Sequence, residues 1–369
     1  MKRLEYIYIM FFLLIVGSVF IMYQPIARSQ TDFYNNLWAP THLLIQGESP
    51  YNTASLHPGL PALWMPTAVG FFSFLGFFSF DAAQQIWLLL NIMGLAILLY
   101  LSIPTAQTFP VLLAGMLLAY FFPPTINHFA LGQVSILSAL CLFGATKLIK
   151  KMPWGSALLL TLGMTKPQIG IFILFGIIIY QLQHDGIKVL FSYLSKVFIT
   201  ALALILPLFI VTPNWIPDFI TSLQSNTSKW THPSILSQLR IWTGNWSYFL
   251  WGLLLLSLLW LIAKMWGTYQ LHMALLWTLA ITVLITPYVW SWDFVFLLPL
   301  FVYIFSVANW KGKIILLIGY CITWGSIAII QTSENFHNSR FWWVPLALIT
   351  ISAIPYFSPN MKNKEAIGY

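Results

Sequence analysis

Long apolar runs with almost no charge follow one another along the chain, and this pattern limits the fold more than any other feature. Hydrophobic residues make up 59% of the chain and charged residues only 7%, whereas a soluble domain carries about 25% charged residues. No soluble fold could hide this much apolar surface, so we expect a polytopic membrane protein. Lipid offers the backbone no hydrogen-bond partner, and the runs are unbroken rather than alternating, which favours helices over a barrel.

The number and length of the apolar runs predict the architecture. They lie near 6–24, 60–80, 83–103, 108–124, 133–149, 154–165, 168–183, 189–212, 246–264, 269–286, 294–309, 314–331 and 343–357. Some are shorter than the roughly 20 residues of a span, and short or broken helices are tolerated where they line a cavity. We therefore predict an all-α protein with about twelve transmembrane helices in a single transmembrane domain over residues 1–369.

The positions of lysine and arginine predict the topology. If the N terminus is cytoplasmic and the run 60–80 returns to the outer face without crossing, twelve of the 17 basic residues lie inside, as the positive-inside rule favours. Taking 60–80 as a true span would place the Lys147–Lys151 cluster outside. We therefore expect a multi-pass protein of the cell inner (plasma) membrane with cytoplasmic N and C termini, and with its unusual polar loops on the outer face.

Several classes of chemistry have no signature in this sequence. A glycine-rich nucleotide motif and a Walker sequence are missing, so an activated substrate would have to arrive on a lipid. The two cysteines, Cys141 and Cys321, lie in apolar runs and are expected to be packing residues. Because no histidine pair has a ligand spacing such as HxxxH, we expect no metal. We also expect no cofactor and no nucleic-acid partner.

Four short motifs in chain order resemble those of a known enzyme family. They are Asp32-Phe33-Tyr34 leading to Gly47-Glu48-Ser49-Pro50-Tyr51, Leu131-Gly132-Gln133-Val134-Ser135, Thr165-Lys166-Pro167-Gln168, and Thr286-Pro287-Tyr288 followed by Trp292-Asp293. Their order and spacing over residues 1–310 are similar to glycosyltransferase family 87, the membrane mannosyltransferase group with the GT-C fold. One departure is that no paired-acid motif follows the first span. The resemblance implies a GT-C-like catalytic core over 1–310 with an extracytoplasmic active-site cavity, and C-terminal helices over 311–369.

The resemblance also implies a reaction and a base. The reaction is an inverting transfer of a hexose, with mannose as the expected sugar, from a polyprenyl-phosphate sugar to a lipid or glycan acceptor. The acceptor hydroxyl must lose its proton, and a carboxylate supplies general-base catalysis worth roughly 10²–10⁴-fold. Asp32 follows the first span with no basic residue within three positions, and we predict that it is this base. The other interpretation is a helix cap or a solvated loop acid.

Three basic side chains are candidates for the donor phosphate, which needs cations or hydrogen-bond donors where negative charge develops. Lys166 lies between two short apolar runs, where a lone lysine costs about 2.5–3.5 kcal/mol and therefore suggests a function. It could instead snorkel to the interface. Arg240, in the long polar loop 213–245, and His128 are the other candidates, although loop bases are common and His128 could be a satisfied polar group at a helix end.

Four residues are candidates for contact with the sugar or the acceptor: Tyr51, Gln133, Trp292 and Asp293. The aromatic rings could stack on a sugar and Gln133 could orient it. An interfacial aromatic belt explains most tryptophans near the outer face equally well, and Asp293 could cap the helix that follows it.

Two other functions compete with the glycosyltransferase prediction. A transporter or flippase for a polar or lipid-linked substrate usually shows inverted repeats and charges near the midplane, and we find no internal repeat. An oligosaccharide polymerase or ligase would also use lipid-linked sugars, but it is expected to have several arginines in a longer central loop. The loop 213–245 holds only Lys229 and Arg240 as basic residues.

Overall fold

The computed structural model describes residues 14–26, 29–56, 60–104, 109–224, 232–268, 270–333 and 337–357. Within these ranges every regular element is a helix, which confirms the all-α prediction. The contacts divide the chain into two compact units. Unit 1 holds the described parts of Ala96–Asn127 and Trp230–Tyr369, and unit 2 holds those of Met10–Leu95 and His128–Lys229. The predicted cytoplasmic termini lie outside the described residues.

The long helices identify a membrane-embedded chain. Five described stretches are long and apolar enough to cross a membrane: α5 (Phe80–Ser102), α10 (Pro167–His184), α11 (Ile187–Val211), Ile235–Thr268 and α17 (Trp310–Gln331). A sixth is possible if α6 (Phe109–Tyr120) and α7 (Pro123–Leu131), bent by 63°, form one broken span. Shorter apolar helices are Leu14–Tyr23, α8 (Ser135–Leu148), α15 (Leu271–Ile285) and Ser291–Val307. The chain is therefore polytopic, and the number of about twelve crossings stays a prediction.

The apolar run at 60–80 does not form a single helix. It holds α4 (Pro66–Phe71) and the 3₁₀ helix η4 (Ser73–Phe77), and a helix of six residues rises only about 9 Å. A Cβ added to Gly70 would overlap the carbonyl oxygen of Leu204 on α11. The missing side chain lets α4 lie directly on the backbone of α11, as small residues do between membrane helices.

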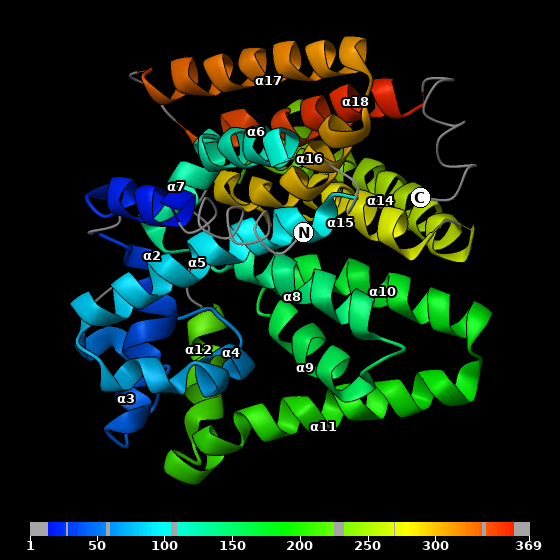
Figure 1. The fold of residues 1–369 in the computed structure, drawn as a ribbon. Helices are drawn as coiled ribbons and strands as arrows, with labels where there is room; N and C mark the ends of the chain where they lie inside the picture. The colour runs from blue at the N-terminus through cyan, green and yellow to red at the C-terminus, as the bar shows by residue number, and fades with distance from the viewer. Residues whose placement is uncertain are drawn as a thin grey trace, which may run out of the picture. The chain divides into compact units, whose positions relative to one another are not determined.

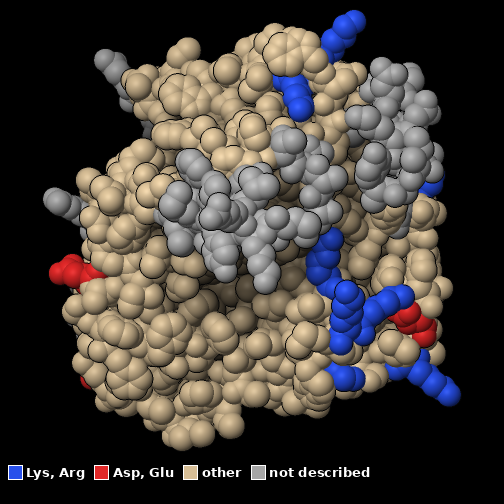
Figure 2. Space-filling model, in the orientation of Figure 1, with Lys and Arg blue, Asp and Glu red and all other residues tan. Residues whose placement is uncertain are grey.

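The centre of unit 2 is three successive helices that alternate in direction. α8, α9 (Pro153–Gly163) and α10 pack together, and α11 packs across α9 (Figure 1). The α8–α9 and α10–α11 connections meet at one end, where Lys150 Nζ lies 3.1 Å from Asp185 Oδ1. Most of the basic side chains visible in Figure 2 gather over these connections. The opposite end of the three helices is formed by residues 132–135 and 163–167.

Unit 1 is a second helical bundle. α14 (Ser247–Thr268) packs on α15, and α16 (Leu298–Val307) packs on α6, α15 and α18 (Val344–Tyr356). Every residue of α15 from Met273 onward is buried. The predicted division after residue 310 falls inside this unit, because α18 packs on both α15 and α16.

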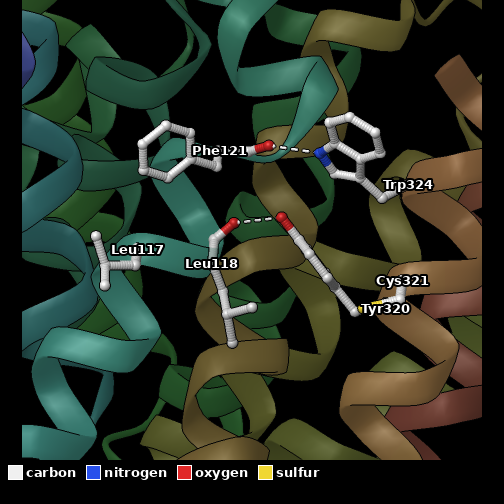
Figure 3. A pocket seen from close by; sticks show the side chains of 6 residues that line it. All are labelled: Leu117, Leu118, Phe121, Tyr320, Cys321 and Trp324. Carbon is white, nitrogen blue, oxygen red and sulfur yellow. Dashed lines mark hydrogen bonds between the residues drawn. The ribbon is translucent and has the colours of Figure 1, made fainter.

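The break between α6 and α7 frees backbone carbonyl groups that α17 engages. Tyr320 Oη donates to the carbonyl oxygen of Leu118, and Trp324 Nε1 donates to that of Phe121, both at 2.8 Å (Figure 3). The two aromatic side chains border an apolar pocket of about 390 Å³, which is also lined by Leu117 and Cys321. They satisfy one carbonyl in the last turn of α6 and one in the turn that follows it, where the backbone has no partner within a helix.

The predicted loop 213–245 is largely helical, which corrects the sequence analysis. It contains α12 (Trp215–Gln224) and α13 (Ile235–Thr243), and the short η5 (Gly244–Trp246) begins at its end. The interpretation as a loop failed because apolar and polar residues alternate at helical spacing there, so no long apolar run marks the helices. Other short helices are η3 (Thr53–Ser55), η6 (Ser291–Leu297) and η7 (Asn338–Phe341).

Candidate functional site

Asp32 lies in the first turn of a helical stretch that is not regular. α2 (Thr31–Phe33) continues into the π-helix η2 (Tyr34–Trp38) and then into α3 (Ala39–Ile45). The N–H of Ala39 donates to the carbonyl of Tyr34, which closes the wide turn. The Asp32 side chain is half-buried. Single π turns occur often at functional sites, and this one begins two residues after the predicted base.

Gln133 follows a turn that requires glycine. Gly132 has φ of +68°, and its N–H donates to the carbonyl of Phe129 at 3.2 Å while the N–H of Gln133 donates to that of His128 at 3.0 Å. This pair of bonds is the Schellman ending of a helix. A Cβ on Gly132 would lie 2.6 Å from Cβ of Phe33. The turn therefore lies directly against the helix that carries Asp32.

Lys166 lies in the break between α9 and α10. Pro167 begins α10 and Lys166 is the residue before it, with non-helical φ and ψ of −111° and 84°. The lysine side chain is only 7% exposed. Its Nζ donates to Oε1 of Gln133 at 2.9 Å. The break thus directs a buried ammonium group toward the turn at Gly132.

One amide joins the lysine to the carboxylate. Gln133 Nε2 donates to Oδ2 of Asp32, and Gln133 Oε1 accepts from Lys166. We call Lys166, Gln133 and Asp32 the Lys–Gln–Asp chain. Three predicted site residues, from three separate motifs, therefore meet in unit 2, at the end of α8, α9 and α10 that lies away from the basic connections. A half-buried carboxylate can accept a proton there, and a buried ammonium can bind an anion.

Two residues that sequence reasoning missed hold this chain in place. The indole of Trp87 stacks on Phe33 with ring centres 5.1 Å apart, and its Nε1 donates to the carbonyl of Gly132 at 2.8 Å. Asn36 Nδ2 donates to the backbone carbonyl of Asp32 at 3.1 Å, and Asn36 Oδ1 accepts from the N–H of Leu63 at 2.8 Å. The sequence does show a tryptophan inside the apolar run 83–103. Tryptophans of an interfacial aromatic belt or of a packed core look the same in a sequence, so the role of Trp87 is not recognisable from it.

Two other predicted residues are buried in unit 2 as parts of its framework. His128 is 0% exposed, and its Nε2 lies 3.0 Å from Oδ1 of Asn91. Tyr51 donates its hydroxyl to the carbonyl of Trp64 at 3.0 Å, and burial raises the pKa of its phenol well above the usual value. These positions favour structural roles, so a phosphate role for His128 and a sugar contact for Tyr51 stay predictions.

The remaining predicted residues belong to unit 1. Arg240 is exposed on α13, where its guanidinium lies 5.9 Å from the ring centre of Tyr248. Asp293 is fully buried and its Oδ2 accepts from the N–H of Trp290 at 3.0 Å. Asp293 therefore caps the start of η6, as the helix-cap interpretation predicts, because its carboxylate accepts from the N–H of the residue before this helix. The ring of Trp292 stacks on Trp290 at 4.8 Å.

A histidine completes an aromatic cluster with these tryptophans. The imidazole of His232 lies 4.3 Å from the ring centre of Tyr288 and 4.7 Å from that of Trp290, and burial lowers its pKa. Trp290 Nε1 donates to the hydroxyl of Tyr288 at 3.1 Å. Stacked rings of this kind can hold the face of a sugar, so contact between Trp292 and the substrate stays a prediction.

The fold and the site define a polytopic membrane protein with a buried polar chain at one end of a helical bundle. Residues 63–291, well over half of the 369 residues, match the sequence model of glycosyltransferase family 87. The chain belongs to this family. A comparison with curated proteins found no match. The matched range includes Gln133 and Lys166 and begins after Asp32, so the family assignment does not itself test the role of Asp32.

Proposed function

We propose that this glycosyltransferase moves a hexose, with mannose as the expected sugar, from a polyprenyl-phosphate sugar to a lipid or glycan acceptor on the extracytoplasmic face. The observation that carries the proposal is the Lys–Gln–Asp chain, which brings a carboxylate and a cation together in one polar site. A transfer of this kind needs both groups and little else from the protein.

In the proposed reaction, the carboxylate of Asp32 takes the proton of the acceptor hydroxyl. The acceptor oxygen then attacks the anomeric carbon, and the bond from that carbon to the phosphate oxygen breaks with inversion. Polyprenyl phosphate leaves as an anion without needing a proton, and the ammonium of Lys166 stabilises the charge that develops on it. The proton acquired by Asp32 passes to water after the product departs.

The extracytoplasmic placement rests on charge. Lys147 lies in the last turn of α8, and Lys150 and Lys151 lie in the α8–α9 connection. Lys188 lies in the first turn of α11. Basic residues gather on the cytoplasmic side of membrane helices. The Lys–Gln–Asp chain lies at the other end of α8, α9 and α10, so we assign it to the outer side, where lipid-linked rather than nucleotide-linked donors are available.

The test is transfer by the purified protein. Detergent-solubilised enzyme is incubated with a panel of radiolabelled polyprenyl-phosphate hexoses and membrane lipids, and the label that moves identifies the sugar. Asp32→Asn is expected to lower turnover by at least the roughly 10²–10⁴-fold of a lost general base while expression stays normal. Asp81→Asn, which removes an exposed carboxylate at the start of α5, is the matched control. Near-normal turnover of Asp32→Asn would remove Asp32 as the base.

A further inference from the structure

The side chain of Gln133 uses both halves of its amide. Its partners leave one orientation, because the ammonium of Lys166 offers only donors and an ionised carboxylate only acceptors. The amide oxygen therefore faces Lys166 Nζ at 2.9 Å, and the amide nitrogen faces Asp32 Oδ2. Gln133 is 4% exposed, and its backbone belongs to the Gly132 turn. A buried side chain held at both ends is arranged to position its neighbours.

We infer that Gln133 is a positioning residue that links the cation for the donor phosphate to the base, rather than a contact to the sugar. This inference rests on the proposed function. A donated hydrogen bond favours the ionised form of a carboxylate and fixes its direction. The same amide holds Lys166 with its positive charge toward the site. One neutral side chain thereby places both reactive groups and couples the position of one to that of the other.

The isosteric replacements of Gln133 separate its two contacts. In Gln133→Glu, an ionised glutamate can still accept from Lys166 but has no hydrogen to give to Asp32. In Gln133→Met, both bonds are lost with little change in volume. Gln181→Met is the matched control, because Gln181 is also a buried glutamine of unit 2, 2% exposed. It lies on α10 about 20 Å from Lys166 along the helix axis.

The pH dependence of kcat/KM separates positioning from a purely structural role. In Gln133→Met, loss of the donated hydrogen bond should raise the pKa of Asp32 and move the acid limb of the profile to higher pH. In Gln133→Glu the limb should move further, by about one pH unit, because a second negative charge then faces Asp32. The other titratable groups on elements around Asp32 are Tyr34 and His42 on its own helix, Asp81 on α5, His128 on α7 and Lys166 before α10. All of these remain in Gln133→Glu and Gln133→Met, so a shift of the acid limb in these two variants reports the change at Gln133.

The binding of unglycosylated polyprenyl phosphate gives a readout that does not need turnover. Lys166→Met is expected to weaken this binding about tenfold or more, and Gln133→Met less. The double variant should bind no more weakly than Lys166→Met alone, since residues that act through one another are not additive. We expect kcat of Gln133→Met to fall about 10–100-fold, the effect of a small misplacement of reactive groups, with Gln181→Met close to wild type.

Four outcomes decide the inference. A shifted acid limb in Gln133→Glu together with non-additive binding supports it. Equal loss of rate at all pH values, with an unmoved limb, overturns it in favour of a structural role. A change confined to the choice or KM of the donor sugar overturns it in favour of a sugar contact. If the wild-type protein transfers no sugar although it binds polyprenyl phosphate, the proposed function fails, and additive binding in the double variant would then overturn the link itself.

Discussion

At the scale of single residues, the site depends on one turn that lies between two helices. Gly132 adopts a left-handed backbone conformation, and because it has no Cβ its backbone can lie directly against Phe33. The residue after Gly132 carries the bridging amide and the residue before Phe33 is the proposed base. Close approach of the two backbones at this point is therefore a condition for the contact between Gln133 and Asp32.

The substitution Gly132→Ala should cost both stability and activity. The left-handed conformation alone costs a non-glycine residue about 1–2 kcal/mol, and the clash with Phe33 should add about 1–3 kcal/mol of overpacking. Gly186→Ala is the control, because Gly186 has φ of +84° but no atom within 4 Å of the added Cβ. Thermal unfolding of both variants checks this. Equal losses of stability would mean that Phe33 moves aside at no cost.

Lys166→Met should affect the donor rather than the acceptor. The ammonium is buried and is joined to the proposed base by the side chain of Gln133. Its loss should raise KM for the polyprenyl-phosphate sugar at least tenfold and leave KM for the acceptor nearly unchanged. Lys151→Met, at the exposed α8–α9 connection, controls for loss of a positive charge. Steady-state kinetics with each substrate varied in turn give the answer. An effect confined to the acceptor would contradict the phosphate role.

At the scale of elements, α17 stabilises a broken span. The last turn of α6 and the turn that follows it leave carbonyl groups with no helical partner. Water could hydrogen-bond to such carbonyl groups, but lipid cannot. Tyr320 and Trp324, one helical turn apart on α17, donate to two of these carbonyls (Figure 3). The bend at residues 121–122 is thus held by side chains from a helix about 200 positions away in the sequence.

Tyr320→Phe and Trp324→Phe should each lower the free energy of unfolding by about 0.5–1.7 kcal/mol. Each change removes one hydrogen bond within a membrane protein, where single bonds contribute about 0.6 kcal/mol on average and up to about 1.7. Trp310→Phe on the same helix is the control, since Trp310 is 74% exposed. Unfolding in mixed detergent and denaturant, followed by helical circular dichroism, measures the difference. Losses no larger than that of Trp310→Phe would show that the bend does not need these bonds.

At the scale of the whole molecule, the hydropathy and motifs of the sequence predict the helices and the family, whereas contacts between distant residues cannot be predicted from it. The runs 168–183 and 189–212 became α10 (167–184) and α11 (187–211) because each span must be apolar along its length. The motifs led to glycosyltransferase family 87, which the match over residues 63–291 confirms. The bond between Gln133 and Asp32 joins positions 101 residues apart. No local pattern encodes such a pairing, so the sequence alone predicts a sugar contact for Gln133 and does not reveal its bond to Asp32.

Cysteine labelling in intact cells tests the proposed topology. In a background without Cys141 and Cys321, Asp81→Cys is expected to react with a membrane-impermeant maleimide added outside, because 60–80 should return to the outer face. Lys151→Cys should react only after the cells are made permeable, since the basic connections should face the cytoplasm. Both positions are exposed, so failure to label is not due to burial. Labelling of position 81 only in permeable cells would reverse the assignment of 60–80.

The wide turn at Tyr34–Trp38 makes the geometry of the Lys–Gln–Asp chain sensitive to the number of residues in that turn. A π turn holds one residue more than the α-helical turn it replaces, so deleting a single residue there would allow a regular helix from Thr31 to Ile45. Such a shortening would rotate everything on the N-terminal side by about 100° relative to α3. The carboxylate would then turn away from the amide that meets it, although no residue of the site would have changed its identity.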